Sequence, residues 1–557
     1  MSLELNESDI ERYAKLVHKC IEEDNANKII ATLCMLTIEQ RKAVVTFKVD
    51  GNPALCLACL KNNVDSVRYL LRECDADIEQ RRLYIDPKYK TNLEVPPLWC
   101  ATVPENGIDT VQILLEHGAD PNGHSNTQST AVRSACYSLN IPTVKQLVEH
   151  GADVNRTNLY GSTCLMVSTP SVELCAYLIS QGVNVNSVDR DGYTALHYAS
   201  QDNKFETVQL LCKNGAVINT RTENGDTPLR TAAYKGYVSV VKYLLDTKVF
   251  STENEMEAFE LLGCFLVDDD VTRCVQMWES AIHLRSRIIR YVNVNADNVN
   301  QRPEIMKTVD ISTLDSLHNL MDPNEFYMQA LHKYSLIYGE TDSTTVSEII
   351  YRGAFYADNG CYQRCLDLWK YAYKLRFNQN DPLNRDTVKS ATDLVYLLCE
   401  MQRALNAGKT KEMIQTVDLI EISQMIVDQI EFGKNVFRDR PINIIDLEQY
   451  QYLMELTLHI VQIVRCLVVT ETERESFKNL FVHLVEIDPR GTTNQTLLHL
   501  AVNPQISNIR KDFLTTFPSL HVVKVLLLCG IRIDIRDDAG HTALDISIRY
   551  SNKNENE

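Results

Sequence analysis

The sequence predicts an all-α solenoid, a stack of short helical hairpins, and three observations carry this prediction. A turn-and-helix opening recurs through the first half of the 557-residue chain. A second signal closes each unit, and apolar stripes fill the interval between the two signals. The threonine-equivalent positions 130, 163, 194 and 227 lie 33, 31 and 33 residues apart. This period and these landmarks are typical of ankyrin repeats.

The opening signal has a mechanical explanation in each of its residue types. Threonine caps the first helix, proline is tolerated in its first turn, and leucine starts the buried stripe. The openings are NPAL from Asn52, PPLW from Pro96, STAV from Ser129, STCL from Ser162, YTALH from Tyr193 and DTPLR from Asp226. The sequence therefore predicts a helix start at each of them.

The closing signal predicts where the second helix of each unit ends. It reads CDADIE, HGADPN, HGADVN, QGVNVN and NGAVIN in successive units. Its glycine suits the left-handed conformation that terminates a helix. One helix pair cannot bury its apolar stripe alone, so neighbouring units must stack.

The first half of the chain divides into a cap and a repeat array. Residues 1–48 are helical in pattern and resemble degenerate capping helices. Residues 49–247 carry the ankyrin repeats, and an insertion at about 78–95 predicts a long finger. The finger is either decoration or part of a binding site, and the sequence favours neither interpretation.

The second half of the chain carries different sequence signals. Residues 254–400 resemble TPR-like helical hairpins, in which Trp278 and Trp369 hold corresponding core places. A helical connector follows at 401–485, incomplete carboxy-terminal ankyrin repeats at 486–550, and a polar tail at 551–557.

Composition argues against several classes of partner. The formal net charge of −18 repels phosphate backbones and anionic lipids, so no nucleic acid and no membrane partner is expected. The longest apolar run, 459–470, is too short to span a bilayer, and the amino terminus lacks a secretory signal. Seventeen scattered cysteines suit a reducing compartment. The sequence therefore predicts a cytoplasmic or nuclear protein.

Motifs for catalysis, cofactors or metals are not found, so we expect no catalytic residue, no cofactor and no metal site. His197 and His499 stand where a histidine ties neighbouring ankyrin turns by hydrogen bonds. Cys56 and Cys59 form one CxxC, which we interpret as core because no second ligand pair follows. The acidic run at 268–270 is interpreted as a solvated loop between helices and not as a metal site.

Several longer segments resemble the Fem (feminization) family, and they follow the family's order over nearly the whole chain. They are VPPLW at 95–99, GSTCLM at 161–166, AFELLGCFLVD at 258–268, DPNEFYMQAL at 322–331, YRGAFYADNG with CLDLWKYA at 351–372, DPRG with LLHLAV at 488–502, and FPSL at 517–520. The resemblance implies a non-catalytic substrate-recognition subunit of a cullin-RING ubiquitin ligase. Its expected partners are elongin B, elongin C, a cullin, and target proteins bound by their carboxy-terminal degrons.

The resemblance also implies a degron-binding groove in the early ankyrin units. Carried over residue by residue, it assigns Asp86 in the finger and Trp99 and Ser129 in the groove. Family members bind terminal arginine through acidic side chains, and this sequence has Ser138 where the family has the second aspartate. Arg133 and Tyr137 remain as residues for a different terminal side chain or for a carboxylate.

A second departure concerns the carboxy-terminal end. The family's helical box for elongin and cullin is not seen, because SNKNENE follows soon after GHTALDI. The sequence is therefore expected to be a fragment or short isoform, or to bind targets without recruiting a ligase. The alternative function is an ankyrin/TPR protein-binding scaffold or decoy.

Overall fold

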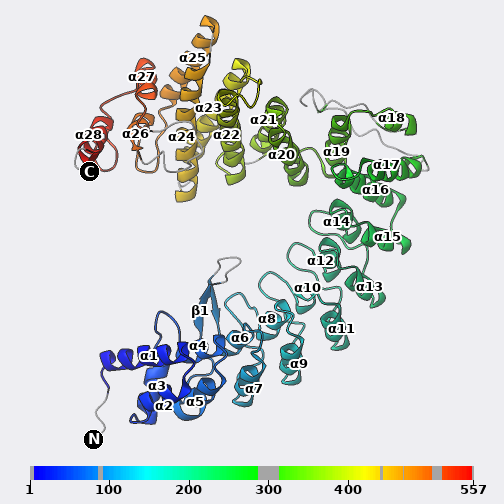
Figure 1. The fold of residues 1–557 in the computed structure, drawn as a ribbon, viewed down its shortest axis with the longest axis vertical. Coiled ribbons are helices and arrows are strands. Elements are labelled where there is room, and N and C mark those ends of the chain that lie inside the picture. The colour runs from blue at the N-terminus through cyan, green and yellow to red at the C-terminus, as the bar shows by residue number, and fades with distance from the viewer. Residues whose placement is uncertain are drawn as a thin grey trace. The chain divides into compact units, whose positions relative to one another are not determined.

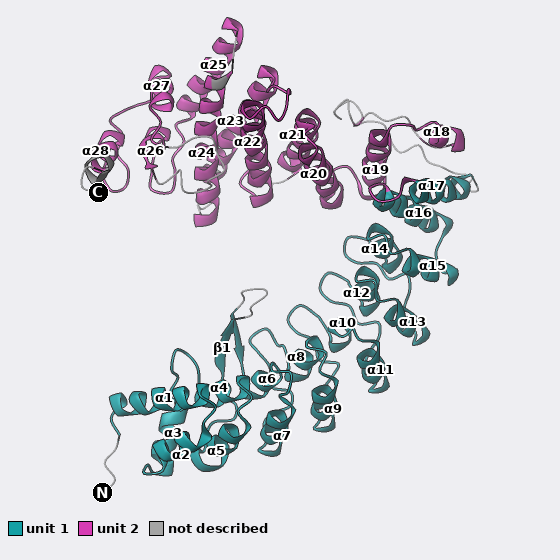
Figure 2. Cartoon of the chain, viewed as in Figure 1, with its two compact units in different colours: residues 1–266, 272–289 teal, residues 267–271, 290–557 magenta. Residues whose placement is uncertain are grey.

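The computed structural model describes residues 5–85, 92–286, 306, 311, 313–379, 381–439, 443–467, 470–504 and 517–554 (Figure 1). The regular elements of these residues are all helices apart from one two-stranded hairpin, so the predicted all-α solenoid is confirmed. The chain divides into two compact units (Figure 2). Unit 1 comprises Met1–Leu266 and Thr272–Ile289, and unit 2 comprises Val267–Val271 and Arg290–Glu557.

Unit 1 stacks its ankyrin helices in two layers, which Figure 1 shows as two rows. The first-helix layer contains α4 (Ala54–Leu60), α6 (Pro97–Ala101), α8 (Ala131–Tyr137), α10 (Cys164–Val167), α12 (Ala195–Gln201) and α14 (Pro228–Tyr234). The second-helix layer contains α5 (Val64–Cys74), α7 (Ile108–Glu116), α9 (Ile141–Glu149), α11 (Val172–Ser180), α13 (Phe205–Lys213) and α15 (Val238–Asp246). Helices α1 (Glu7–Glu22), α2 (Ala26–Leu33) and α3 (Ile38–Thr46) precede the stack, and α16 (Thr252–Leu266) and α17 (Val271–Arg285) follow it.

The helix ends follow the sequence signals. The hydroxyls of Thr130 and Thr194 accept the backbone N–H three residues on, at the starts of α8 and α12. Gly118 and Gly151 follow α7 and α9 with φ of +88° and +89°, a conformation that a side chain would strain. The expected caps and the expected left-handed glycines are therefore confirmed at these positions.

The loops that precede the first helices form a row of fingers joined by backbone hydrogen bonds. Leu159 donates to the carbonyl of Thr127 at 2.9 Å, and Arg190 donates to that of Tyr160 at 3.0 Å. The tie expected of His197 is confirmed by the 3.2 Å between its Nε2 and the carbonyl oxygen of Asp226. Side chains at the fingers are thus held in register from one repeat to the next.

The inserted finger is a β-hairpin. Strand β1 (Arg82–Ile85) pairs antiparallel with β2 (Asn92–Val95), with Leu83 opposite Glu94. Asp86, expected in the finger as a binding residue, lies outside the described residues.

Unit 2 contains the longer helices and a continuous apolar core. They are α18 (Leu314–His318), α19 (Pro323–Tyr338), α20 (Ser343–Asp358), α21 (Tyr362–Gln379), α22 (Arg385–Asn406), α23 (Thr416–Asp439), α24 (Ile444–Cys466), α25 (Glu471–Ile487), α26 (Leu497–Val502), α27 (Leu520–Leu528) and α28 (Ala543–Asn554). His499 Nε2 lies 3.0 Å from the carbonyl oxygen of His541, so the expected tie recurs here.

The expected domain bounds stay a prediction, and the boundary between the two compact units does not coincide with any of them. Helices α16 and α17 fall in the expected TPR-like segment 254–400, but they group with unit 1, and α16 packs against α14. Helix α28 continues to Asn554, four residues into the segment expected to be a polar tail. In the parts of the chain that the structure describes, no helix combines the length and apolar character that a bilayer span requires.

The two tryptophans occupy the core places expected of them. Trp278 donates its indole N–H to the carbonyl of Glu260 at 3.1 Å, and Trp369 donates to that of Ile350 at 2.9 Å. A side chain at Gly263 would overlap the first indole, and one at Gly353 would overlap the second. Each hairpin therefore needs its glycine to admit its tryptophan.

Candidate functional site

The candidate site is a column of side chains along α8. Arg133 and Tyr137 are four residues apart, which places them on one face of the helix, and Ser129 stands directly before the capping Thr130. The Arg133 guanidinium donates from Nη1 to Ser129 Oγ at 3.4 Å and from Nη2 to Ser162 Oγ at 3.0 Å. Ser162 belongs to the next finger, so the guanidinium lies across the boundary between two repeats.

Arg133 is a largely desolvated cation. Burial lowers its pKa, and this effect is opposed by the thiols of Cys164 and Cys136 and the phenols of Tyr198 and Tyr137. Its Nε is buried without a hydrogen-bond partner, and no carboxylate among the described residues lies within ion-pair distance of it. A guanidinium in this setting is a favourable binding group for a carboxylate.

The chain provides an internal comparison for this site. Arg230 is the fourth residue after the opening residue Asp226, as Arg133 is after Ser129. Nε of Arg230 lies 3.3 Å from Oδ1 of Asp226, and both side chains are mostly buried. In the earlier repeat the position equivalent to Asp226 is Ser129, which carries a hydroxyl. Arg133 therefore lacks a carboxylate at the place where Arg230 has one.

Trp99 is not at the surface. It is 7% exposed in α6 and contacts the Tyr84 ring, with ring centroids 5.1 Å apart and an interplanar angle of 60°. The structure thus places Tyr84 of β1 over Trp99. Trp99 therefore packs against the finger through Tyr84 and is too buried to contact a ligand.

Ser138 follows α8 and is exposed. Its hydroxyl donates to the carbonyl of Ser134 at 3.1 Å. Tyr137 beside it is 52% exposed. These two residues can contact a ligand, but the site around Ser138 is open to water.

Sequence reasoning missed Ser162 and Tyr84. Ser162 stands directly before the capping Thr163, as Ser129 stands before Thr130, and this equivalence could have indicated it. Tyr84 could not be found in this way, because its contact with Trp99 depends on how the inserted hairpin folds back over α6.

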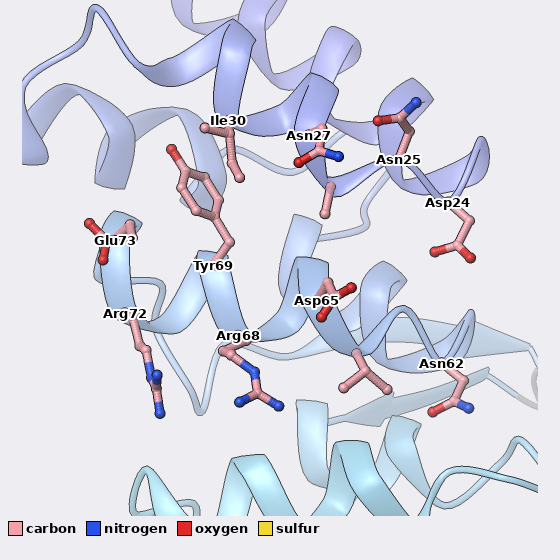
Figure 3. A pocket seen from close by; sticks show the side chains of 12 residues that line it. Asp24, Asn25, Asn27, Ile30, Asn62, Asp65, Arg68, Tyr69, Arg72 and Glu73 are labelled. Atoms are coloured by element: carbon pink, nitrogen blue, oxygen red, sulfur yellow. The ribbon is translucent and has the colours of Figure 1, made fainter.

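A pocket lies elsewhere, between α2 and α5 (Figure 3). Its volume is about 840 Å³, and none of the expected site residues lines it. Tyr69 points toward Ile30 of α2, whereas Arg68 and Arg72 point away from it (Figure 3). Asp24, Asp65 and Glu73 also line the pocket, so its charges are mixed and favour no class of ligand.

Other groups that could suggest chemistry have structural roles. Cys56 and Cys59 are fully buried, and burial raises the pKa of both thiols. Asp268 is exposed in the turn after α16, as expected of a solvated loop, and it accepts two hydrogen bonds from Arg352, at 2.7 and 2.9 Å. The described residues contain no group of three or more potential metal ligands.

The fold and the site together define an ankyrin-repeat, protein-binding protein. Family models for ankyrin repeats match residues 50–82, 98–189 and 163–254. The mouse "Protein fem-1 homolog A-like" is 30% identical over 549 residues, covering 89% of this chain and 82% of its own length. The human "Protein fem-1 homolog A" is 29% identical over 561 residues with the same coverage, and the Xenopus laevis "Protein fem-1 homolog C" is 30% identical over 333 residues. The chain belongs to the fem-1 family.

Proposed function

We propose that unit 1 binds the carboxyl terminus of a target protein and that Arg133 receives the terminal carboxylate. The observation that carries this proposal is the mostly buried guanidinium, held by two serine hydroxyls and facing no described carboxylate. A carboxylate bound through both of its oxygens would supply the negative charge that Arg133 does not receive from the described residues. Every protein chain ends in such a group, and ankyrin surfaces are suited to extended peptides.

The terminal side chain is expected to differ from the arginine that the family resemblance implies. Ser138 replaces an aspartate, and its own hydroxyl is already engaged by the helix. Tyr137 instead offers an exposed ring on the same face as Arg133. We therefore expect terminal residues that contact an aromatic ring to bind better than arginine. Asp86 stays a candidate for the residues that precede the terminus.

At the level of the cell, we propose a substrate-recognition subunit of a cullin-RING ubiquitin ligase. Membership of the fem-1 family and the resemblance of the repeat segments support this role. The chain would bind the degron, and elongin B, elongin C and a cullin would connect it to the subunits that transfer ubiquitin. We expect it to act in the cytoplasm or the nucleus.

Co-purification separates this role from that of a scaffold or decoy. The tagged chain is expressed with elongin B, elongin C and a panel of cullins, in parallel with a longer native form if one exists. Retention of elongin and a cullin by either form supports the ligase role. Their loss from both forms, with target binding intact, would leave the scaffold as the function.

A screen of carboxy-terminal peptide libraries tests the binding role itself. The full chain is offered the same peptides as free acids and as amides. We expect enrichment of free acids only. Equal recovery of both forms would show that an internal segment is bound and that Arg133 receives no terminus.

A further inference from the structure

The finger hairpin has two edges, which differ in their backbone hydrogen bonds. On the β2 edge, the Glu94 N–H donates to Asn126 Oδ1 at 3.0 Å, and the Asn126 N–H donates to the Glu94 carbonyl at 3.2 Å. The backbone of Glu94 therefore points away from β1. Leu83 lies opposite Glu94, and in antiparallel pairing both residues of such a pair point outward. The N–H and C=O of Leu83 face the other edge.

Ile85 has the same orientation, because backbone groups alternate along a strand. In the described part of the chain, one hydrogen bond reaches these outward groups, from Arg82 Nε to the Leu83 carbonyl at 3.3 Å. The β1 edge thus presents two N–H groups and the Ile85 carbonyl without a protein partner among the described residues.

The side chains on this edge are also unusual for a strand in water. Leu83 is 47% exposed and Ile85 is 61% exposed, and both lie on the same face of the hairpin. Native proteins usually protect an edge with lysine, proline or a bulge, and Arg82–Ile85 contains none of these. Tyr84, on the opposite face, contacts Trp99 and so holds the strand in place.

We propose that the β1 edge binds an extended segment of a captured protein as a third strand. The segment carries apolar side chains at every second residue, beside Leu83 and Ile85, and pairs its backbone with theirs. A second copy of the chain is a poorer occupant, because a four-residue edge buries far less than the roughly 1,600 Å² of a standard stable interface. The proposal rests on the proposed function only in taking the segment from a target protein.

A blocked peptide tests the edge separately from the Arg133 site. The probe is a heptapeptide that alternates valine and threonine, acetylated at one end and amidated at the other, so that it has no terminal carboxylate. Amide hydrogen exchange of the full chain is measured with site resolution in the finger. We expect the probe to slow exchange at Leu83 and Ile85 at least fivefold, and a version N-methylated at alternate residues to leave it unchanged.

Two variants and a control identify the edge as the binding surface. Leu83→Pro removes an outward N–H without breaking the ladder to β2, and Ile85→Lys adds a charge while leaving the backbone intact. Both should weaken probe binding at least tenfold. Met35→Lys changes an apolar residue that is 90% exposed elsewhere in unit 1, and should have no effect.

Three outcomes would overturn the proposal. They are no protection at millimolar probe, equal protection by the N-methylated version, or protection that rises with chain concentration without the probe. The third would assign the edge to a second copy. Arg133→Gln should leave probe binding unchanged, so an acid preference that survives in this variant while the edge stays intact would contradict only the proposed function.

Discussion

Nη2 of Arg133 donates to the hydroxyl of Ser162 at 3.0 Å, across the boundary between two ankyrin repeats. Because the fingers of successive repeats are joined by backbone hydrogen bonds, this contact fixes the guanidinium against a rigid row of loops. The position of the cation is therefore set by repeat stacking and not by α8 alone.

Ser129→Asp should weaken the binding of carboxylate-terminated peptides about tenfold. The new carboxylate would stand before Arg133 as Asp226 stands before Arg230, where the two groups form an ion pair. An internal partner would compete with the ligand for the guanidinium. Isothermal titration with a library-selected peptide measures the change. Ser129→Ala is the control and should change the affinity by less than about threefold, since it removes one long hydrogen bond and adds no charge.

Ser138→Asp should raise the preference for arginine-ended peptides, but only about two- to fivefold. Ser138 is exposed, and ion pairs in water contribute roughly 0.2–1 kcal/mol. The measurement is the ratio of affinities for two peptides that differ only in a terminal arginine or leucine. An unchanged ratio would count against Ser138 as the equivalent of the family's aspartate.

Most of the fold could be predicted from the sequence. The period, the threonine caps and the closing glycines specify the later ankyrin units locally, so the positions of α8 and α12 could be predicted without tertiary information. The unit boundary could not, because the packing of α16 on α14 depends on side chains that also suit a TPR-like hairpin.

The candidate site was only partly accessible from the sequence. That Arg133 and Tyr137 share a face follows from helical spacing once α8 is located. The burial of Trp99 depends on the inserted hairpin, whose path over α6 no local pattern specifies. Nor could the sequence show that Ser162 contacts Arg133, since that contact spans two repeats.

Gly353→Ala should destabilise unit 2 by about 1–3 kcal/mol, the usual range for overpacking. The new Cβ would overlap the indole of Trp369, which is held by its hydrogen bond to Ile350. Thermal unfolding measures the loss. Ser347→Ala, at an exposed position of the same helix α20, is the control and should change the melting temperature little. Equal melting temperatures for both variants would contradict the packing described for this hairpin.

Glu455→Gln should stabilise unit 2 at pH 8 and have little effect at pH 4. Burial raises the pKa of Glu455 to about 7, against about 4.3 for an unfolded glutamate. The buried neutral acid therefore contributes stability that is fully present below the unfolded pKa and is lost as the pH rises through 7. The difference is on the order of 2–4 kcal/mol.

Denaturant unfolding of both proteins at pH 4 and pH 8 checks this expectation. His459 lies one turn away on α24, and burial lowers its pKa to about 4, so acid also destabilises the wild type through this residue. That effect is common to wild type and variant and cancels in their difference. A stabilisation that is the same at both pH values would show that Glu455 titrates normally.

The central claim, that Arg133 receives a terminal carboxylate, is tested most directly by a four-way affinity measurement. A library-selected peptide is titrated as free acid and as amide against the wild-type chain and against Arg133→Gln. In the wild type the acid should bind at least tenfold more tightly than the amide, as expected for a desolvated charge pair. In Arg133→Gln the two forms should bind equally. An acid preference that survives in the variant, or that is missing from the wild type, would contradict the account.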